Sequence, residues 1–127
     1  MCSVVHADVV RGCGCRVSRD RRSVTVLVEP NSAGTLLDDV AGNGAIAVVF
    51  SQPSTHRTIQ LKGTDGTVVR VTPRDRALAV QHLEAWIGEL AAIGYEAAFA
   101  RALHGEVPRA MVAVAFTPTS AFQQTPG

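Results

Sequence analysis

The chain has 127 residues, 46% of them hydrophobic and 18% charged, which is typical of one folded domain. A formal net charge of +1 and an aromatic content of 5% exclude a basic, aromatic-rich surface for nucleic acid. No apolar run approaches the roughly 20 residues that cross a bilayer, and no secretory signal is visible. We therefore expect a single cytoplasmic domain over residues 1–127, with no nucleic-acid or membrane partner.

The cysteines and histidines form no recognisable metal or disulfide pattern. Three cysteines are an odd number and predict no disulfide framework. Cys13 and Cys15 would need two further ligands to bind zinc, and Cys2 is the only other thiol. The four histidines are scattered without a paired motif. The pattern indicates reduced structural thiols and no metal site.

Residues 12–28 are predicted to form a β-hairpin with a basic turn. Apolar residues alternate on both sides of a turn that holds Arg19, Asp20, Arg21 and Arg22. A charged turn of this kind is usually a solvated hairpin tip. The alternative is a phosphate contact by the three arginines of this turn, Arg19, Arg21 and Arg22.

A short helix is predicted after Pro30, with Asn31 or Ser32 as its N-cap. Ala33, Leu36, Leu37 and Val40 would share its apolar face. A Gly-Asn-Gly sequence over residues 42–44 ends the pattern. Because a helix N-terminus favours anions, Ser32 is also a candidate phosphate contact.

Residues 45–63 predict two strands joined by a polar turn. Ala45 to Phe50 has no charge and is rich in β-branched residues, as in a buried strand. From Arg57 the pattern alternates, so that Ile59 and Leu61 point to one side. Thr58, Gln60 and Lys62 point to the other side. This second strand has one core face and one face that can form hydrogen bonds.

The remaining elements follow from turn and capping residues. Asp-Gly within residues 64–67 predicts a tight hairpin turn, with residues 68–71 as the returning strand. Thr72, Pro73 and Asp75 predict the capped start of a long helix that ends near Gly94. A second short helix over residues 95–103, a strand over 110–117 and a polar tail from Phe122 complete the chain.

The segment RTIQLKG over residues 57–63, placed after an apolar strand that ends in Phe-Ser, resembles the pyridoxamine 5′-phosphate oxidase-like split barrels. The Gln-Thr-Pro-Gly tail over residues 124–127 is similar to one uncharacterised branch of that family. The resemblance runs from about Gly12 to the end of the chain. It implies an α+β fold, mainly β: an antiparallel split β-barrel of about six strands, with one long helix and one or two short helices packed on it.

The resemblance also implies a homodimer that binds flavin mononucleotide (FMN) between two barrels. Thr58 and Gln60 would contact the polar edge of the flavin ring, and Lys62 would lie near the negative charge of the reduced ring. Ser51 would reach the phosphate or the ribityl chain, and Arg57 the phosphate or a partner carboxylate.

The helix start after Pro30 departs from the family pattern. The family carries a Ser-Arg-Lys segment there that holds the flavin phosphate, and here Ala33 and Gly34 follow Ser32. This difference removes two cations from the expected phosphate site.

The sequence contains no nucleophile elbow, P-loop or zinc-protease motif. This absence fits a protein whose redox chemistry is supplied by a cofactor. The function expected from the resemblance is an FMN-dependent oxidoreductase acting on an unknown small molecule. The alternative is a non-catalytic dimeric module that binds a ligand such as a deazaflavin or haem, or that holds no cofactor.

Overall fold

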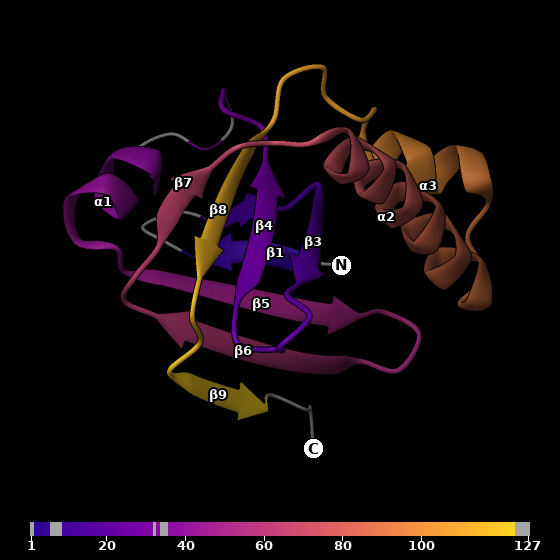
Figure 1. The fold of residues 1–127 in the computed structure, drawn as a ribbon. Coiled ribbons are helices and arrows are strands. Elements are labelled where there is room, and N and C mark those ends of the chain that lie inside the picture. The colour runs from indigo at the N-terminus through magenta and orange to yellow at the C-terminus, as the bar shows by residue number, and fades with distance from the viewer. Residues whose placement is uncertain (1, 6–8, 32, 34–35, 124–127) are drawn as a thin grey trace.

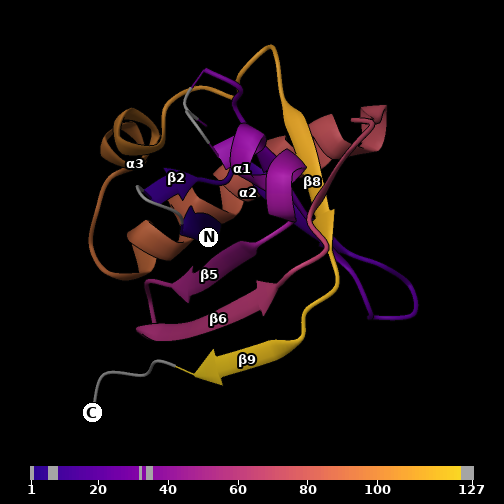
Figure 2. The same ribbon diagram turned by 90° about the vertical axis from the view of Figure 1, so that its left-hand side faces the viewer.

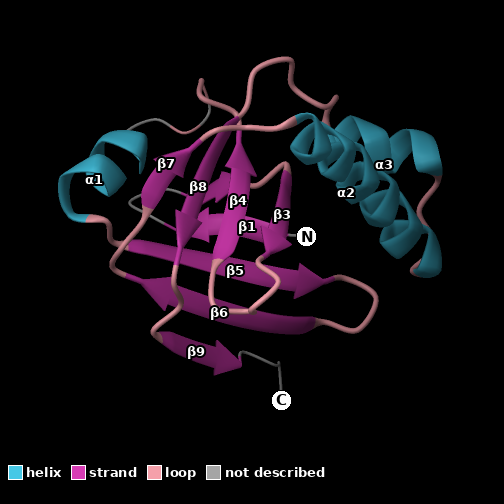
Figure 3. Ribbon diagram, viewed as in Figure 1, coloured by secondary structure: helices cyan, strands magenta, loops and turns pink. Residues whose placement is uncertain are grey.

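The fold consists of two antiparallel β-sheets and three helices (Figures 1 and 3). The computed structural model describes residues 2–5, 9–31, 33 and 36–123. The first sheet has the order β2 (Val9–Arg11), β1 (Cys2–Val5), β5 (Ile46–Gln52), β6 (Arg57–Gly63) and β9 (Ser120–Gln123). The second has the order β3 (Gly14–Val17), β4 (Val24–Val28), β8 (Val112–Phe116) and β7 (Thr67–Val69). The helices are α1 (Leu36–Asn43), α2 (Pro73–Ala92) and α3 (Ala97–His104).

The main core lies between the two sheets. Alternate residues of β4 and β8 point toward alternate residues of β1 and β5, because side chains in a strand alternate between its faces. The buried strand residues of this core are Val4, Val10, Val24, Val26, Val28, Ile46, Val48, Val114 and Phe116. Helix α1 adds Leu36 and Val40. The α+β class expected from the sequence is confirmed.

A second, smaller core lies on the opposite side of β4. Leu27 and Ala113 point away from the first sheet and pack with Cys13 and with Ala79 of α2. Gly14 also faces Ala79, and a Cβ at Gly14 would lie 3.5 Å from the Ala79 Cα atom. Helix α2 therefore covers the outer side of the second sheet near β3, and α3 packs against α2 beyond it (Figure 1).

The strands and helix with the clearest patterns are confirmed. The predicted strand pair corresponds to β5 and β6, which are joined by a short turn in the same sheet. The predicted hairpin corresponds to β3 and β4. At the start of α2, Thr72 and Asp75 form a complete capping box with Pro73 in the first turn.

The predicted hairpin at residues 64–67 is wrong. After β6 the chain crosses to the second sheet, where β7 pairs with β8. Two contacts hold this crossing: Gly66 N donates to Gly44 O at 2.8 Å, and Thr117 N donates to the Asp65 carboxylate at 2.7 Å. The edge of β6 that a returning strand would have used is occupied by β9.

The chain also differs from the expected strand count and helix start. Among the described residues there are nine strands and not about six, because β1, β2 and β9 carry no clear pattern. Helix α1 begins at Leu36, and Asn31 lies in a turn before it, so Asn31 is not its cap. Ser32, the other predicted cap, lies outside the described residues.

Gly63 ends β6 where the two sheets approach each other. A Cβ built there would lie 2.7 Å from the Phe116 ring and 2.9 Å from Thr117 O. We expect Gly63→Ala to lower the free energy of unfolding by about 1–3 kcal/mol in urea titrations, because backbone and a core ring must both move. Gly88→Ala is the control: nothing lies within 4 Å of a Cβ there, and we expect a gain of about 0.5–1 kcal/mol. Equal effects would contradict this reading of Gly63.

Asp75 connects α2 to β3. Its carboxylate is fully buried, accepts from Arg16 Nε at 2.8 Å and accepts from Thr72 N at 2.9 Å. Burial alone would raise the pKa of Asp75, but the Thr72 amide and the Arg16 guanidinium outweigh it and lower that pKa.

We expect Asp75→Asn to cost about 2–4 kcal/mol of unfolding free energy, because it weakens the cap and leaves Arg16 without its counter-charge. The measurement is urea unfolding followed by circular dichroism. Asp38→Asn, on the exposed side of α1, is the matched control and should cost at most about 1 kcal/mol. A cost at Asp75 no larger than at Asp38 would show that the ion pair adds nothing.

Candidate functional site

The candidate site is the outer face of β5 and β6, turned away from the core between the sheets. Ser51 lies directly opposite Thr58, and Gln60 and Lys62 follow on the same side of β6 because strand side chains alternate. We call these four residues the β5–β6 polar face. Ser51, Thr58 and Gln60 are half-buried, and Lys62 is exposed. The structure thus brings together four of the six residues expected from the sequence.

Neighbouring strands extend this face with small and apolar side chains. The register places Val49 opposite Gln60 in β5 and Phe122 opposite Gln60 in β9. Among the described elements, Figures 1 and 2 show no helix over β5, β6 and β9 on this side. Helices α2 and α3 lie on the side of the molecule where a turn joins β5 to β6. The face therefore combines hydrogen-bonding groups with a flat apolar surface.

Lys62 borders a cavity at one end of the face. Its ammonium lies 5.4 Å from the centre of the Phe122 ring, a cation–π distance. The cavity has a volume of about 430 Å³, within the range of small-ligand sites. It is lined by residues 45–47, Lys62, Gly63, Thr64, Thr119 and Ser120.

Arg57 and Ser32 are not part of this group in the structure. Arg57 pairs with Gln52 at the start of β6, so alternation places it on the opposite side from Thr58. Its side chain is exposed. Ser32 lies outside the described residues, and Ala33, its neighbour, is buried in the main core.

Sequence reasoning missed β9. Phe122, which was expected to begin a polar tail, and Ser120, which was assigned to no element, both contribute to the site from this strand. The only available signal was the alternation of Ser120, Ala121, Phe122 and Gln123, which is too short to distinguish a strand from a loop.

The groups on this face are suited to binding a ligand. In β5, β6 and β9 it presents hydroxyl, amide and ammonium groups, and it contains no carboxylate, imidazole or thiol. Such groups can hold the polar edge of a flat ligand and place a positive charge beside it. A reaction at this face would therefore need a reactive group brought by the ligand.

The comparisons with known proteins add no family. No protein-family model matches the chain, and no curated protein matches it either. None of the helices in the described ranges has the length and apolar character needed to cross a membrane.

Two histidines lie between α2 and α3, away from the polar face. The rings of His82 and His104 are 5.5 Å apart between centroids, and Nε2 of each is buried without a hydrogen-bond partner in the described structure. Burial lowers the pKa of His82 to about 4, with smaller contributions from His104 and Arg11. Trp86 Nε1 of α2 donates to Ala100 O of α3 at 3.0 Å, which adds a hydrogen bond between the same two helices.

We expect His82 to make stability depend on pH between 6.5 and 4. Above its ordinary pKa of 6.5, both folded and unfolded chains hold it neutral. As the pH falls toward 4, only the unfolded chain takes up a proton, so the free energy of unfolding decreases. The limit is about 3 kcal/mol, and solvent screening of this partly exposed ring reduces it to about 1–2 kcal/mol.

The measurement is urea unfolding at several pH values for the wild type, His82→Gln and the exposed control His56→Asn. His82→Gln should flatten the slope in this interval, whereas His56→Asn should retain it. An unchanged slope in His82→Gln would assign the pH dependence to other groups.

Proposed function

We propose that the chain binds FMN along the β5–β6 polar face and acts as a flavin-dependent oxidoreductase on a small molecule. The observation that carries this proposal is the placement of Thr58, Gln60 and Lys62 on one outer face of β6, beside Ser51 of β5. The resemblance of RTIQLKG to the pyridoxamine 5′-phosphate oxidase-like split barrels requires this arrangement of a polar strand face. Arg57 lies on the other side and has no direct role in the proposal.

The groups on this face fit a flavin. The ring of a flavin is flat, with one edge of alternating carbonyl and N–H groups, which a hydroxyl and an amide can both match. The side chains of Thr58 and Gln60 supply these, and Val49 and Phe122 offer apolar surface for the ring. Lys62 would stabilise negative charge on the ring or the phosphate. A bound flavin would supply the electron transfer, while these residues bind and orient it.

The arrangement of the sheets is compatible with a split barrel. The strands of the second sheet run across those of the first, with the core between them (Figure 1). The polar face is then on the outside of the protomer. A site that encloses a flavin therefore needs a second surface, and we propose that a second copy of the chain provides it. Phe122, which is 49% exposed, would be covered in such a homodimer.

We expect FMN to bind freshly purified protein and to remain bound through gel filtration. Thr58→Val combined with Gln60→Leu should weaken binding by about tenfold or more, because two hydrogen bonds of about 1 kcal/mol each are lost. The measurement is quenching of flavin fluorescence at constant protein concentration. Thr67→Val, the same change on exposed β7, is the control and should leave affinity within twofold.

Two further readouts separate the parts of the proposal. Sedimentation analysis should show a dimer, and oxidation of a reduced nicotinamide by the flavin-loaded protein distinguishes an enzyme from a binding module. Flavin binding without turnover would favour the non-catalytic module. Equal flavin affinity in the wild type and the Thr58/Gln60 variant would refute the site, and a Soret band in place of flavin absorbance would indicate haem.

A further inference from the structure

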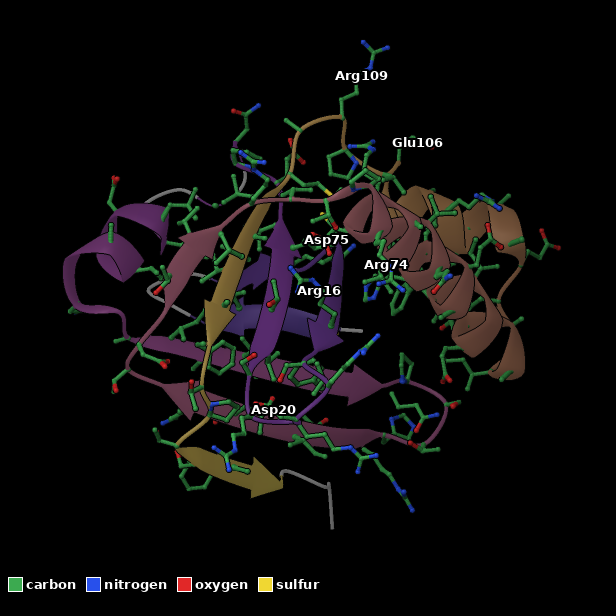
Figure 4. The ribbon with its side chains drawn as sticks, viewed as in Figure 1. Arg16, Asp20, Arg74, Asp75, Glu106 and Arg109 are labelled. Carbon is green, nitrogen blue, oxygen red and sulfur yellow. The ribbon has the colours of Figure 1, made fainter. Side chains whose placement is uncertain are left out.

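A groove lies where β3 and the turn after it meet the first turns of α2. Its volume is about 630 Å³. Three arginines line it: Arg16 from β3, Arg19 from the turn and Arg74 from α2. Figure 4 shows Arg16 and Arg74 close to Asp75 at this junction. We call it the arginine groove.

Arg16 is held in place by Asp75. The fully buried carboxylate accepts from Arg16 Nε at 2.8 Å, while its other oxygen is used by Thr72 N. This bond uses only one of the donors of the guanidinium, and the Arg16 side chain is 40% exposed. Arg16 is therefore a pre-positioned cation with donors left for a ligand.

Arg19 and Arg74 have no carboxylate partner in the described part of the chain. No ion pair or side-chain hydrogen bond holds either guanidinium there. The nearest acid in the sequence, Asp20, accepts from Ser18 Oγ at 2.5 Å and from Arg22 N at 3.1 Å. Its carboxylate thus bonds within the turn, forms no ion pair with Arg19 in the described part of the chain and does not line the groove.

The charges in the groove are unbalanced. Three guanidinium groups face one carboxylate, so the groove carries a net charge of +2 in a chain whose total is +1. The N-terminal end of α2, a helix of 20 residues, adds the positive end of its dipole at the same place. Several cations in a concave site raise the local concentration of anions.

We propose that the arginine groove binds the phosphate group of a small phosphorylated molecule. Guanidinium groups bind phosphate oxygens through paired N–H donors, and the net charge of +2 in the groove balances the charge of about −2 of a phosphate monoester. The cavity is large enough for a small organic molecule and not only for the anion. Leu78 and Val17 supply apolar lining, and Gln81 adds a hydrogen-bonding amide.

This site is distinct from the β5–β6 polar face. Arg16 lies on the side of β3 that faces α2, whereas the polar face lies on the outer side of the other sheet. The core of both sheets separates them. The inference therefore holds with or without bound flavin, and its test uses flavin-free protein.

The test is a titration with inorganic phosphate at constant ionic strength, followed by the side-chain Nε–H and backbone NMR signals. Phosphate should shift the signals of Arg16, Arg19 and Arg74 in a saturable way. Arg19→Gln combined with Arg74→Gln should raise the dissociation constant at least tenfold. Arg21→Gln combined with Arg22→Gln removes the same charge from the β3–β4 turn outside the groove, and should change the dissociation constant less than twofold.

The Arg19/Arg74 variant should fold as the wild type does, because neither side chain holds a described contact; circular dichroism and the melting temperature check this. If it does not fold, Arg74→Gln alone replaces it, with an expected threefold or larger loss. Phosphate shifts that never saturate, or equal losses in the two double variants, would overturn the site and leave only general attraction between charges.

Discussion

The fold depends on the burial of β4 from both sides. Every residue of Val24–Val28 is buried: Val24, Val26 and Val28 face the first sheet, and Leu27 packs under α2. A strand covered on both faces must lie in the middle of a layered structure. The outer layers are then the first sheet on one side and α2 on the other. One side of each outer layer packs against the core, and the opposite side can present residues that bind a ligand.

The two proposed sites lie on different sides of this arrangement. In the first sheet the alternation of β6 packs Leu61 against the core and points Thr58, Gln60 and Lys62 outward. At α2 the capping residue Asp75 fixes the helix start and also holds Arg16 from β3. In both places a side chain needed for folding determines where a polar or charged neighbour points. Binding groups are thereby positioned on strands and a capped helix, which hold them more rigidly than loops do.

Local patterns made the strongest elements predictable. The alternation of RTIQLKG, the Thr72–Asp75 capping box and the apolar run before Ser51 all correspond to elements of the structure. Three of the six residues expected at the site, Thr58, Gln60 and Lys62, share one face because alternation is a property of the strand alone, and Ser51 joins them through the register of β5 with β6. Two of the predictions that failed depend on distant contacts. The chain crosses to the other sheet after the Asp-Gly turn because Gly44 and Thr117 form hydrogen bonds with this segment. Strand β9 forms because it pairs with the edge of β6.

The arginine groove also depends on residues that are distant in the sequence. The sequence drew attention to Arg19, Arg21 and Arg22, because they lie together in a basic turn. The structure groups Arg19 with Arg16 and Arg74, which lies more than fifty residues further along the chain. A run of charged residues in the sequence indicates a segment exposed to solvent. A binding site needs cations that lie close together in space. Asp75, an acid, positions one of them, Arg16, because its buried charge requires an arginine partner. A fully buried acid therefore directs a cation to the site, which counting arginines cannot reveal.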